Sequence, residues 1–419
     1  MRIVICLSLA CGLAAAAARP WDQAPAPGGP PSTGVPASPT FAEDVAFLQR
    51  HAPVRVLVAP SGARVAVSAP YQGRVMTSAV AAEGASLGWI NRAFIAAGKT
   101  GTAFDNYGGE DRFWLGPEGG QYGLYFPPGK PFLFSEWRTP AALQEGAWEV
   151  KEAADDHVVF VRPMALTNYA GTRFALEVER RVRLLPDAEV APRLGIDLAA
   201  AKARGAKWVA FETVNRITNR GPEPWIRERG LLSIWILAMY APSPDGHVLV
   251  PFETAGTGPI VNDAYFGKVP ADRLAVRENE GHLVFKSDGQ HRGKIGLGPA
   301  RAREVLGSYS ASTRLLTLVH YDKPKGARDY VNSMWETQKE PYAGDVVNSY
   351  NDGPPGPGLP SLGGFYELET SSPAAALRPG ESLVHTHRTF HFVGDRPALD
   401  PVATRVLGVS ASRMAEGVR

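Results

Sequence analysis

The chain has 419 residues, of which 44% are hydrophobic and 21% are charged, and 44 Lys and Arg residues stand against 42 Asp and Glu. The net charge of +2 at pH 7 gives no basic field for nucleic acid, and the hydrophobic share excludes a chain that is disordered throughout. Gly and Pro number 44 and 36, which is typical of many short strands joined by turns rather than of a helical bundle.

The first residues are expected to be a signal peptide. Residues 1–18 combine Arg2 with an apolar run and a small-residue cleavage site at Ala18. Because the apolar run is short for a membrane span, we expect no transmembrane segment in the mature chain and a periplasmic or secreted protein. Cys11 permits a less favoured alternative, a lipoprotein. Cys6 and Cys11 are the two cysteines, so the rest of the chain has no disulfide, thiolate zinc site or cysteine nucleophile.

The mature chain is expected to begin with a linker and continue as one domain. Residues 19–40 are rich in Pro, Gly and Ala, which is typical of a disordered linker. A Thr-x-x-Glu capping box then predicts a short amphipathic helix over 41–51. Strand-like segments follow without a convincing linker, so we predict a single β-sandwich over 41–407 and a C-terminal tail over 408–419. Two sandwiches sharing this length are the alternative.

Hydrophobic patterning predicts mostly strands. Residues 173–185 alternate apolar and polar side chains, which indicates a half-buried antiparallel strand. Residues 231–240 are apolar on both faces and fit a central strand. Helical periodicity is rare after the first helix, and the best candidate for a later helix is the segment 326–336. Further strands are expected over 54–58, 63–69, 157–162, 207–218, 314–321, 364–370 and 383–393.

The densest polar and aromatic segment is the glycine-rich stretch 108–120. A sugar site needs carboxylates and an arginine to bind pairs of hydroxyls, and an indole to cover the apolar CH face of the ring. We therefore select Asp111, Arg112 and Trp114 as candidate substrate-binding residues and Glu118 as a candidate catalytic residue. The alternative is a turn with a surface Arg–carboxylate pair and a core tryptophan.

A second candidate segment combines a Gly/Pro-rich loop with the strand that follows it. Asn351 and Asp352 at the start of the loop are candidate substrate-binding residues, since such loops close over ligands. In the strand over 364–370, Glu367 and Glu369 share one face. Paired carboxylates there can act as general base and acid. The alternative is a solvated strand face.

Histidines give two further candidates. His385, His387 and His391 share one face of a strand, and a cupin-like metal site is the weaker interpretation of them. The favoured interpretation is the polar face of an outer strand, so we expect no metal and no cofactor. His320, at a strand end, is a candidate general acid, with a structural histidine as the alternative. The sequence contains no serine-hydrolase elbow, phosphate loop or dinucleotide-binding fingerprint.

Segments 108–118, 218–221, 367–370 and 377–382 together resemble the galactose mutarotase-like (aldose 1-epimerase-like) superfamily, and within it a secreted bacterial branch. The resemblance implies a large antiparallel β-sandwich whose concave sheet binds a carbohydrate. In its epimerases a late-strand glutamate takes the proton of the anomeric hydroxyl and a histidine protonates the ring oxygen. Glu367 or Glu369 matches that glutamate, whereas the Asn-His strand signature has no counterpart here. The same fold also carries glycan hydrolases, lyases and non-catalytic sugar-binding domains.

These observations lead to two hypotheses. The first is an exported enzyme of the glycoside hydrolase or epimerase type, acting at the anomeric centre of a sugar or glycan by carboxylate acid–base chemistry. Its catalytic candidates are Glu367, Glu369, Glu118 and His320. The second is a non-catalytic carbohydrate-binding protein that stacks sugars on tryptophans, for which the candidates are Trp114, Trp137, Trp148, Trp225 and Trp335.

Overall fold

The computed structural model describes residues 39–101, 103–356 and 358–418, so the expected signal peptide and the expected linker up to residue 38 lie outside the described residues. The named strands pair antiparallel and form three sheets, and the all-β antiparallel class expected from the sequence is confirmed. The smallest sheet has the order β1-β2-β3. Its strands are β1 (Arg55–Val58), β2 (Arg64–Ser68) and β3 (Arg74–Ala79), and the first two confirm the strands expected over 54–58 and 63–69.

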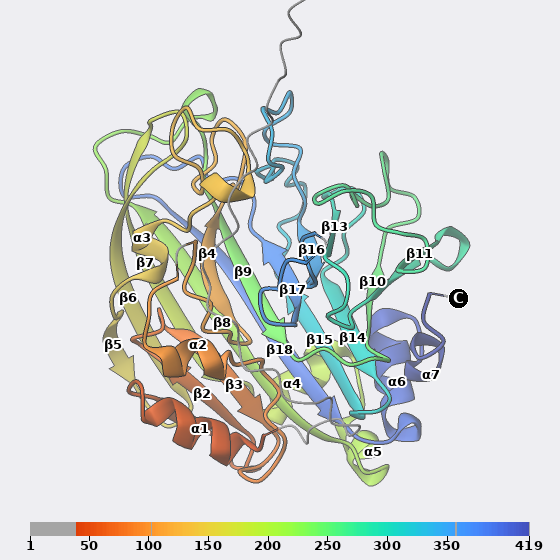
Figure 1. The fold of residues 1–419 in the computed structure, drawn as a ribbon. Helices are drawn as coiled ribbons and strands as arrows, with labels where there is room; N and C mark the ends of the chain where they lie inside the picture. Colours follow the sequence, from red (N-terminus) through yellow and green to blue (C-terminus); the bar gives the residue numbers. More distant parts are fainter. Residues whose placement is uncertain (1–38, 102, 357, 419) are drawn as a thin grey trace, which may run out of the picture. The chain divides into compact units, whose positions relative to one another are not determined.

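The largest sheet has ten strands in the order β11-β12-β10-β14-β15-β18-β8-β7-β6-β5 (Figure 1). Five strands expected from the sequence are confirmed here, as β6, β7, β8, β15 and β18. The strands are β5 (Glu149–Ala153), β6 (His157–Thr167), β7 (Arg173–Leu184), β8 (Lys207–Asn219), β10 (His247–Pro251), β11 (Leu274–Arg277), β12 (His282–Lys286), β14 (Val305–Ser310), β15 (Leu315–Tyr321) and β18 (Ser382–Val393).

The third sheet has five strands in the order β13-β16-β17-β9-β4. Its β9 confirms the strand expected over 231–240, is buried along its whole length and lies between two neighbours, as the doubly apolar pattern predicts. Its β4 falls within the polar stretch interpreted as a loop or turn, but Phe113 and Trp114 in it favour a strand, and it pairs with β9. The strands are β4 (Arg112–Gly116), β9 (Ser233–Tyr240), β13 (Gly293–Leu297), β16 (Val347–Asn351) and β17 (Tyr366–Ser371).

One face of the five-stranded sheet packs against the ten-stranded sheet. Ile236 of β9 belongs to the same core cluster as Val178 of β7, and Leu368 of β17 to the same cluster as Val319 of β15. The two sheets therefore form a sandwich with interdigitating inner faces. Side chains of opposite parity on the five-stranded sheet point away from this core, because successive residues of a strand face opposite sides.

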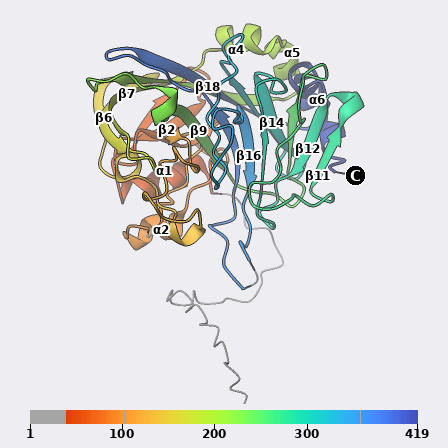
Figure 2. The same ribbon diagram turned by 90° about the horizontal axis from the view of Figure 1, so that it is seen from above.

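Short helices cover the outer face of the ten-stranded sheet. Residues of α4, α5 and α6 form a core cluster with Leu316 and Phe390 of that sheet, and Figure 2 shows these helices on one side of β14 and β18, with β9 and β16 on the other. The helices are α1 (Phe41–Gln49), α2 (Arg92–Ala97), α3 (Ala141–Gln144), α4 (Asp187–Leu194), α5 (Leu198–Ala203), α6 (Arg396–Leu407) and α7 (Ala411–Met414). In the described part of the chain, no helix has the length and apolarity needed to cross a membrane.

The first helix starts as the sequence predicts. The side chain of Thr40 accepts a hydrogen bond from the backbone N–H of Glu43 at 3.2 Å, and the Glu43 carboxylate accepts one from the backbone N–H of Thr40 at 2.8 Å. This reciprocal pair is a capping box that satisfies two N–H groups at the helix start. The helix ends at Gln49, two residues before the expected end.

One expectation for the later chain is wrong, and another segment contains a helix that the sequence pattern did not predict. Residues 326–336 contain no helix, because their backbone bonds reach another loop instead: Tyr330 donates to Tyr342 and Asn332 donates to Pro341. The expected C-terminal tail contains α7, with Ala411 and Met414 buried in the same cluster as α6. In both places tertiary contacts decide the local structure, which helical periodicity of the sequence alone does not reveal.

A layer of buried polar side chains lies inside the sandwich. Arg180 occupies an inward position of β7 and is fully buried, as is Asp111 immediately before β4. The Arg180 guanidinium donates hydrogen bonds to the Asp111 carboxylate at 2.6 Å, to the Asn215 side chain at 2.6 Å and to the carbonyl of Gly73 at 2.9 Å. Asp111 also accepts a bond from Thr213 at 2.9 Å. The charged pair is thus hydrogen-bonded on several sides, which offsets the cost of burying it.

The three histidines of β18 belong to this layer, so their interpretation as a polar outer face is wrong. His385 and His387 each lie within hydrogen-bond distance of the Thr370 hydroxyl on β17, at 2.8 and 2.9 Å. His391 lies 3.1 Å from Glu110. Burial lowers the pKa of His385 to about 3 and that of His387 to about 4. Among the described residues, no group of three His, Cys, Asp or Glu is arranged to hold a metal ion.

This burial predicts a pH-dependent stability. A histidine of the unfolded chain has a pKa of about 6.5, so between that pH and about 4 the unfolded chain binds a proton that buried His387 does not. The free energy of unfolding should therefore fall as the pH is lowered, by about 1.4 kcal/mol per pH unit for this residue. In urea unfolding between about pH 6.5 and 5, His387→Gln should show a shallower pH dependence by that amount. Parallel pH profiles for the two proteins would contradict this.

Candidate active site

A cavity of about 70 Å³ lies against the face of the five-stranded sheet that points away from the sandwich core. Arg112 of β4, Lys294 of β13 and Glu367 of β17 contribute charged side chains to it. Leu368, next to Glu367, and Ile295, next to Lys294, point into the sandwich. Because successive residues of a strand face opposite sides, Glu367 and Lys294 point the other way, toward the cavity. Three strands that are distant in sequence thus place three charges at one cavity.

Glu367 is paired with Arg112 inside this cavity. The Glu367 Oε1 atom lies 3.0 Å from Arg112 Nη2, and both side chains are almost fully buried. The guanidinium carbon of Arg112 lies 4.0 Å from the ring centroid of Trp114. Burial and the Glu369 carboxylate, opposed by Arg112, together raise the pKa of Glu367 to about 8. Glu367 therefore exchanges its proton near neutral pH, as a general acid or base must.

Glu369 lies behind Glu367 and is fully buried. Its Oε2 accepts hydrogen bonds from Lys294 Nζ and from Trp235 Nε1, both at 2.8 Å. Burial lowers the pKa of Lys294, but the carboxylates of Glu369 and Glu118 more than offset this and raise it, so the ammonium stays charged. Glu369 is therefore placed to position Lys294 and to raise the pKa of Glu367 rather than to contact a ligand.

Glu118 reaches the cavity from the loop that follows β4. Its Oε1 accepts a hydrogen bond from Trp137 Nε1 at 2.9 Å, and its backbone N–H donates to Ser333 at 3.1 Å. Burial raises the pKa of Glu118, which Lys294 and Trp335 counteract. The cavity thus contains two carboxyl groups, from the early and the late candidate segments, and burial favours the protonated form of both.

Aromatic rings form much of the wall. Trp335 and Trp137 lie with ring centroids 6.4 Å apart and planes 21° apart, and Phe134 is nearly parallel to Trp335 at 6.3 Å. Trp335, Phe134 and Phe266 are half-buried, so part of their surface is accessible to a ligand. Rings of this kind cover the apolar CH face of a sugar while neighbouring polar groups bind its hydroxyls.

Two long loops meet above the cavity, one after β4 and one between β15 and β16, and both lie at the upper end of the molecule in Figure 1. Gln121 and Gln338 exchange hydrogen bonds between them at 2.8 and 2.9 Å. A Cβ atom on Gly119 would lie 2.6 Å from the carbonyl of Met334 and 2.9 Å from Trp335 Cα. Because the two backbones approach so closely, only a glycine fits at position 119. The same approach places Glu118 beside Trp335.

Three of the sequence-selected binding candidates lie outside the cavity. Asp111 is directed into the sandwich, where it binds Arg180. Asn351 also has the inward parity and binds the backbone of Gly289 and His291. Asp352 accepts bonds from the backbone N–H groups of residues 363 and 364 and from Tyr350, which fixes the loop before β17. Their hydrogen bonds are made within the protein, so we assign them no contact with a ligand.

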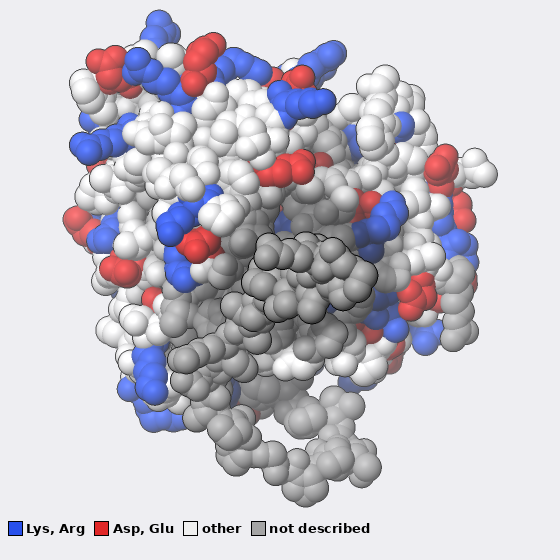
Figure 3. All heavy atoms as spheres, turned by 45° about the horizontal axis from the view of Figure 1, so that its top comes forward, with Lys and Arg blue, Asp and Glu red and all other residues white. Residues whose placement is uncertain are grey.

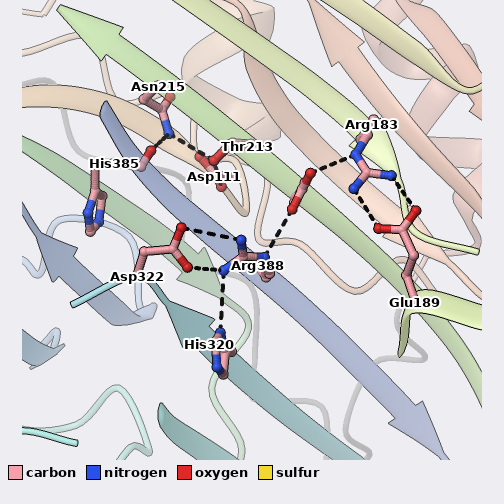
Figure 4. A network of polar contacts seen from close by, with 10 residues as sticks. Asp111, Arg183, Glu189, Thr213, Asn215, His320, Asp322, His385 and Arg388 are labelled. Carbon is pink, nitrogen blue, oxygen red and sulfur yellow. Dashed lines mark hydrogen bonds and ion pairs between the residues drawn. The ribbon is translucent and has the colours of Figure 1, made fainter. Parts of the chain in front are cut away.

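His320 is remote from this cavity and takes part in a charged row across the outer face of the ten-stranded sheet (Figure 4). Arg388 lies opposite it on β18, with Nη1 3.4 Å from His320 Nδ1, and binds Glu212 at 2.9 Å and Asp322 at 2.6 Å. Glu212 also binds Arg183 of β7, at 2.6 Å, which extends the row of charges. Burial and the nearby charge of Arg388 together lower the pKa of His320 to about 4. His320 lines a larger, open cavity of about 930 Å³ that contains none of the candidate carboxylates.

Two further cations, Lys294 and Arg292, line the cavity and were not indicated by any sequence motif. Lys294 stands in the short segment Gly-Lys-Ile-Gly-Leu, and a lysine at the outward position of an apolar pentapeptide was the available signal. Of the tryptophans considered for stacking, Trp114, Trp137 and Trp335 line the cavity. The other two, Trp148 and Trp225, pack edge-on against Phe113 and Phe174 in the core.

Comparisons with known proteins give one family and several structures. The model of a family of unknown function, DUF6786, matches residues 39–417. No curated protein shows significant sequence similarity. Among solved structures, a candidate aldose 1-epimerase of Escherichia coli K12 is 11% identical with a TM-score of 0.46, and the match covers 81% of this chain and 99% of that one.

Two structures from lactobacilli are similar as well. A galactose mutarotase related enzyme of Lactobacillus acidophilus is 9% identical with a TM-score of 0.42, covering 82% of this chain and 98% of its own. A galactose mutarotase-like protein of Lactobacillus casei is 10% identical with a TM-score of 0.42, covering 81% and 100%. Mutarotase-like structures are thus among the proteins that this chain resembles.

Proposed function

The chain belongs to the DUF6786 family, and we propose that it is an exported carbohydrate-active enzyme that acts at the anomeric centre of a sugar or glycan. The cavity lined by Glu118 and Glu367 is the proposed active site. Export is part of the proposal and is supported by the signal-peptide pattern of residues 1–18.

One observation carries the proposal: two buried carboxyl groups with raised pKa values share a cavity with aromatic walls. Acid–base catalysis at an anomeric centre needs one group that accepts a proton and one that donates it. Lys294 and Arg112 hold positive charge beside these carboxyl groups and favour the ionised form of whichever group has lost its proton. The aromatic rings supply the apolar surface on which a sugar ring stacks.

In the epimerase form of the proposal, the ionised carboxylate accepts the proton of the anomeric hydroxyl. The protonated carboxyl group gives its proton to the ring oxygen, and the bond between that oxygen and the anomeric carbon breaks. The open sugar rotates and closes on the other face, and the two protons return. In the hydrolase form, the acid protonates the leaving oxygen and the base activates a water. Both forms use Glu118 and Glu367 as the pair, with Glu369 as a positioning residue.

Proton NMR of the anomeric region tests the proposal directly. The purified chain without residues 1–18 is added to a panel of freshly dissolved sugars and oligosaccharides. Faster α/β equilibration than in buffer is the result expected of an epimerase, and new reducing-end signals are the result expected of a hydrolase. Saturation transfer to a sugar without any turnover would favour the alternative, a carbohydrate-binding protein. Spectra unchanged in both respects over the panel would contradict the proposal for those sugars.

A further inference from the structure

Arg292 differs from the other cations of the proposed active site. Arg112 is paired with Glu367 and Lys294 with Glu369, but none of the ion pairs among the described residues involves Arg292. Its Nε atom is buried and has no hydrogen-bond partner, and its guanidinium interacts with the neutral hydroxyl of Tyr350. Arg292 therefore brings to the cavity a positive charge that no carboxylate of the described chain neutralises.

Aromatic rings hold the guanidinium of Arg292. Its central carbon lies 3.7 Å from the ring centroid of Phe266 and 5.6 Å from that of Phe134. Stacking on a ring fixes the guanidinium plane and leaves its donors at the edge of that plane, where they match the two oxygens of a carboxylate or of a phosphate or sulfate group. The rings also displace part of the water around the charge, which strengthens its attraction for an anion.

We propose that the sugar bound in this cavity carries an anionic group, a carboxylate, phosphate or sulfate, which pairs with Arg292. The inference rests on the proposed function and specifies its substrate class. Any preference for an anion would come from the cavity itself and not from the charge of the surrounding surface. On the surface visible in Figure 3, Lys and Arg are interspersed with Asp and Glu and form no large basic area. The net charge of +2 likewise gives no long-range attraction.

Matched pairs of neutral and anionic sugars test the proposal. Titration calorimetry compares glucose with glucuronate, galactose with galacturonate, and each hexose with its 6-phosphate and 6-sulfate. We expect at least one anionic member to bind about tenfold or more tightly than its neutral counterpart, as a charge-assisted bidentate bond provides. The carboxylate, phosphate and sulfate arms identify which group is recognised.

Variants assign the preference to one side chain. Arg292→Gln should reduce the ratio of the affinities for the anionic and the neutral sugar to about one. Arg292→Lys should retain part of that ratio, because Lys keeps the charge without the planar fork. The matched control is Arg216→Gln, an exposed arginine on β8, which should change neither affinity. Circular dichroism of each variant checks that it is folded.

The possible failures are distinguishable. Equal binding of neutral and anionic sugars, or an anionic preference that persists in Arg292→Gln, would overturn this inference and leave the proposed function standing. Absence of binding and turnover for every sugar in the set would overturn both.

Discussion

Replacing Glu367 by Gln is expected to lower turnover of the sugar substrate by about 10²- to 10⁴-fold, the usual loss when a general acid or base is removed. Gln has the shape of the protonated carboxyl group but cannot transfer its proton. Because burial raises the pKa of Glu367 to about 8, its protonated form is accessible near neutral pH, and Gln should replace that form with little change in sugar binding. Anomeric proton NMR measures the turnover, and calorimetry measures the binding.

Glu118→Gln is expected to have a loss of similar size, since Glu118 is the second member of the pair. The matched control is Glu149→Gln, at an exposed position of β5, which should retain full turnover. If Glu118→Gln and Glu367→Gln both retained full turnover of a proven substrate, the assignment of this cavity as the active site would be wrong. If sugar binding were lost with turnover, these residues would bind the ligand without transferring protons.

The largest effect on stability is expected at the buried ion pair between β7 and the start of β4. Arg180→Met leaves the Asp111 carboxylate fully buried without its charged partner, and such a change costs about 3–5 kcal/mol of the free energy of unfolding. Asp111→Asn should cost a comparable amount, because Arg180 then loses its counter-charge. Urea unfolding at neutral pH measures both.

A double variant and an exposed pair make this prediction specific. Arg180→Met combined with Asp111→Asn removes both charges, so its cost should be well below the sum of the two single costs. The exposed pair Arg220 and Glu177 is the control, and breaking it should cost about 0–1 kcal/mol. Additive costs at Arg180 and Asp111, or a cost of Arg180→Met no larger than that of the exposed pair, would contradict the prediction.

Much of the sheet structure could be predicted from hydrophobic alternation. The pattern over 173–185 identified β7, and the doubly apolar run over 231–240 identified β9 as a buried strand. The parity of 364–370 placed Glu367 and Glu369 on one face, opposite Tyr366 and Leu368, as the structure shows. These features are local, since one strand and its alternation suffice to determine them.

Other elements depended on partners distant in sequence. Arg112–Gly116 is a strand because β9 pairs with it, and 326–336 is irregular because its backbone bonds go to the segment around residues 341–342. Some residues selected from the sequence also lie in an environment different from the expected one. The histidines of β18 face an opposing sheet instead of solvent, since the position of β18 within the sheet is a property of the whole topology.

For the candidate site, the sequence by itself determined which residue types were available: carboxylates in two segments, an arginine, and several tryptophans. Only the tertiary structure brought Glu118, Arg112 and Glu367 to one cavity and directed Asp111 and Asn351 into the sandwich. It also added Lys294 and Arg292, which no motif marked. The reason is physical: alternation along a strand tells which side chains share a face, but which strands are neighbours and which loops bury them depends on packing between distant segments.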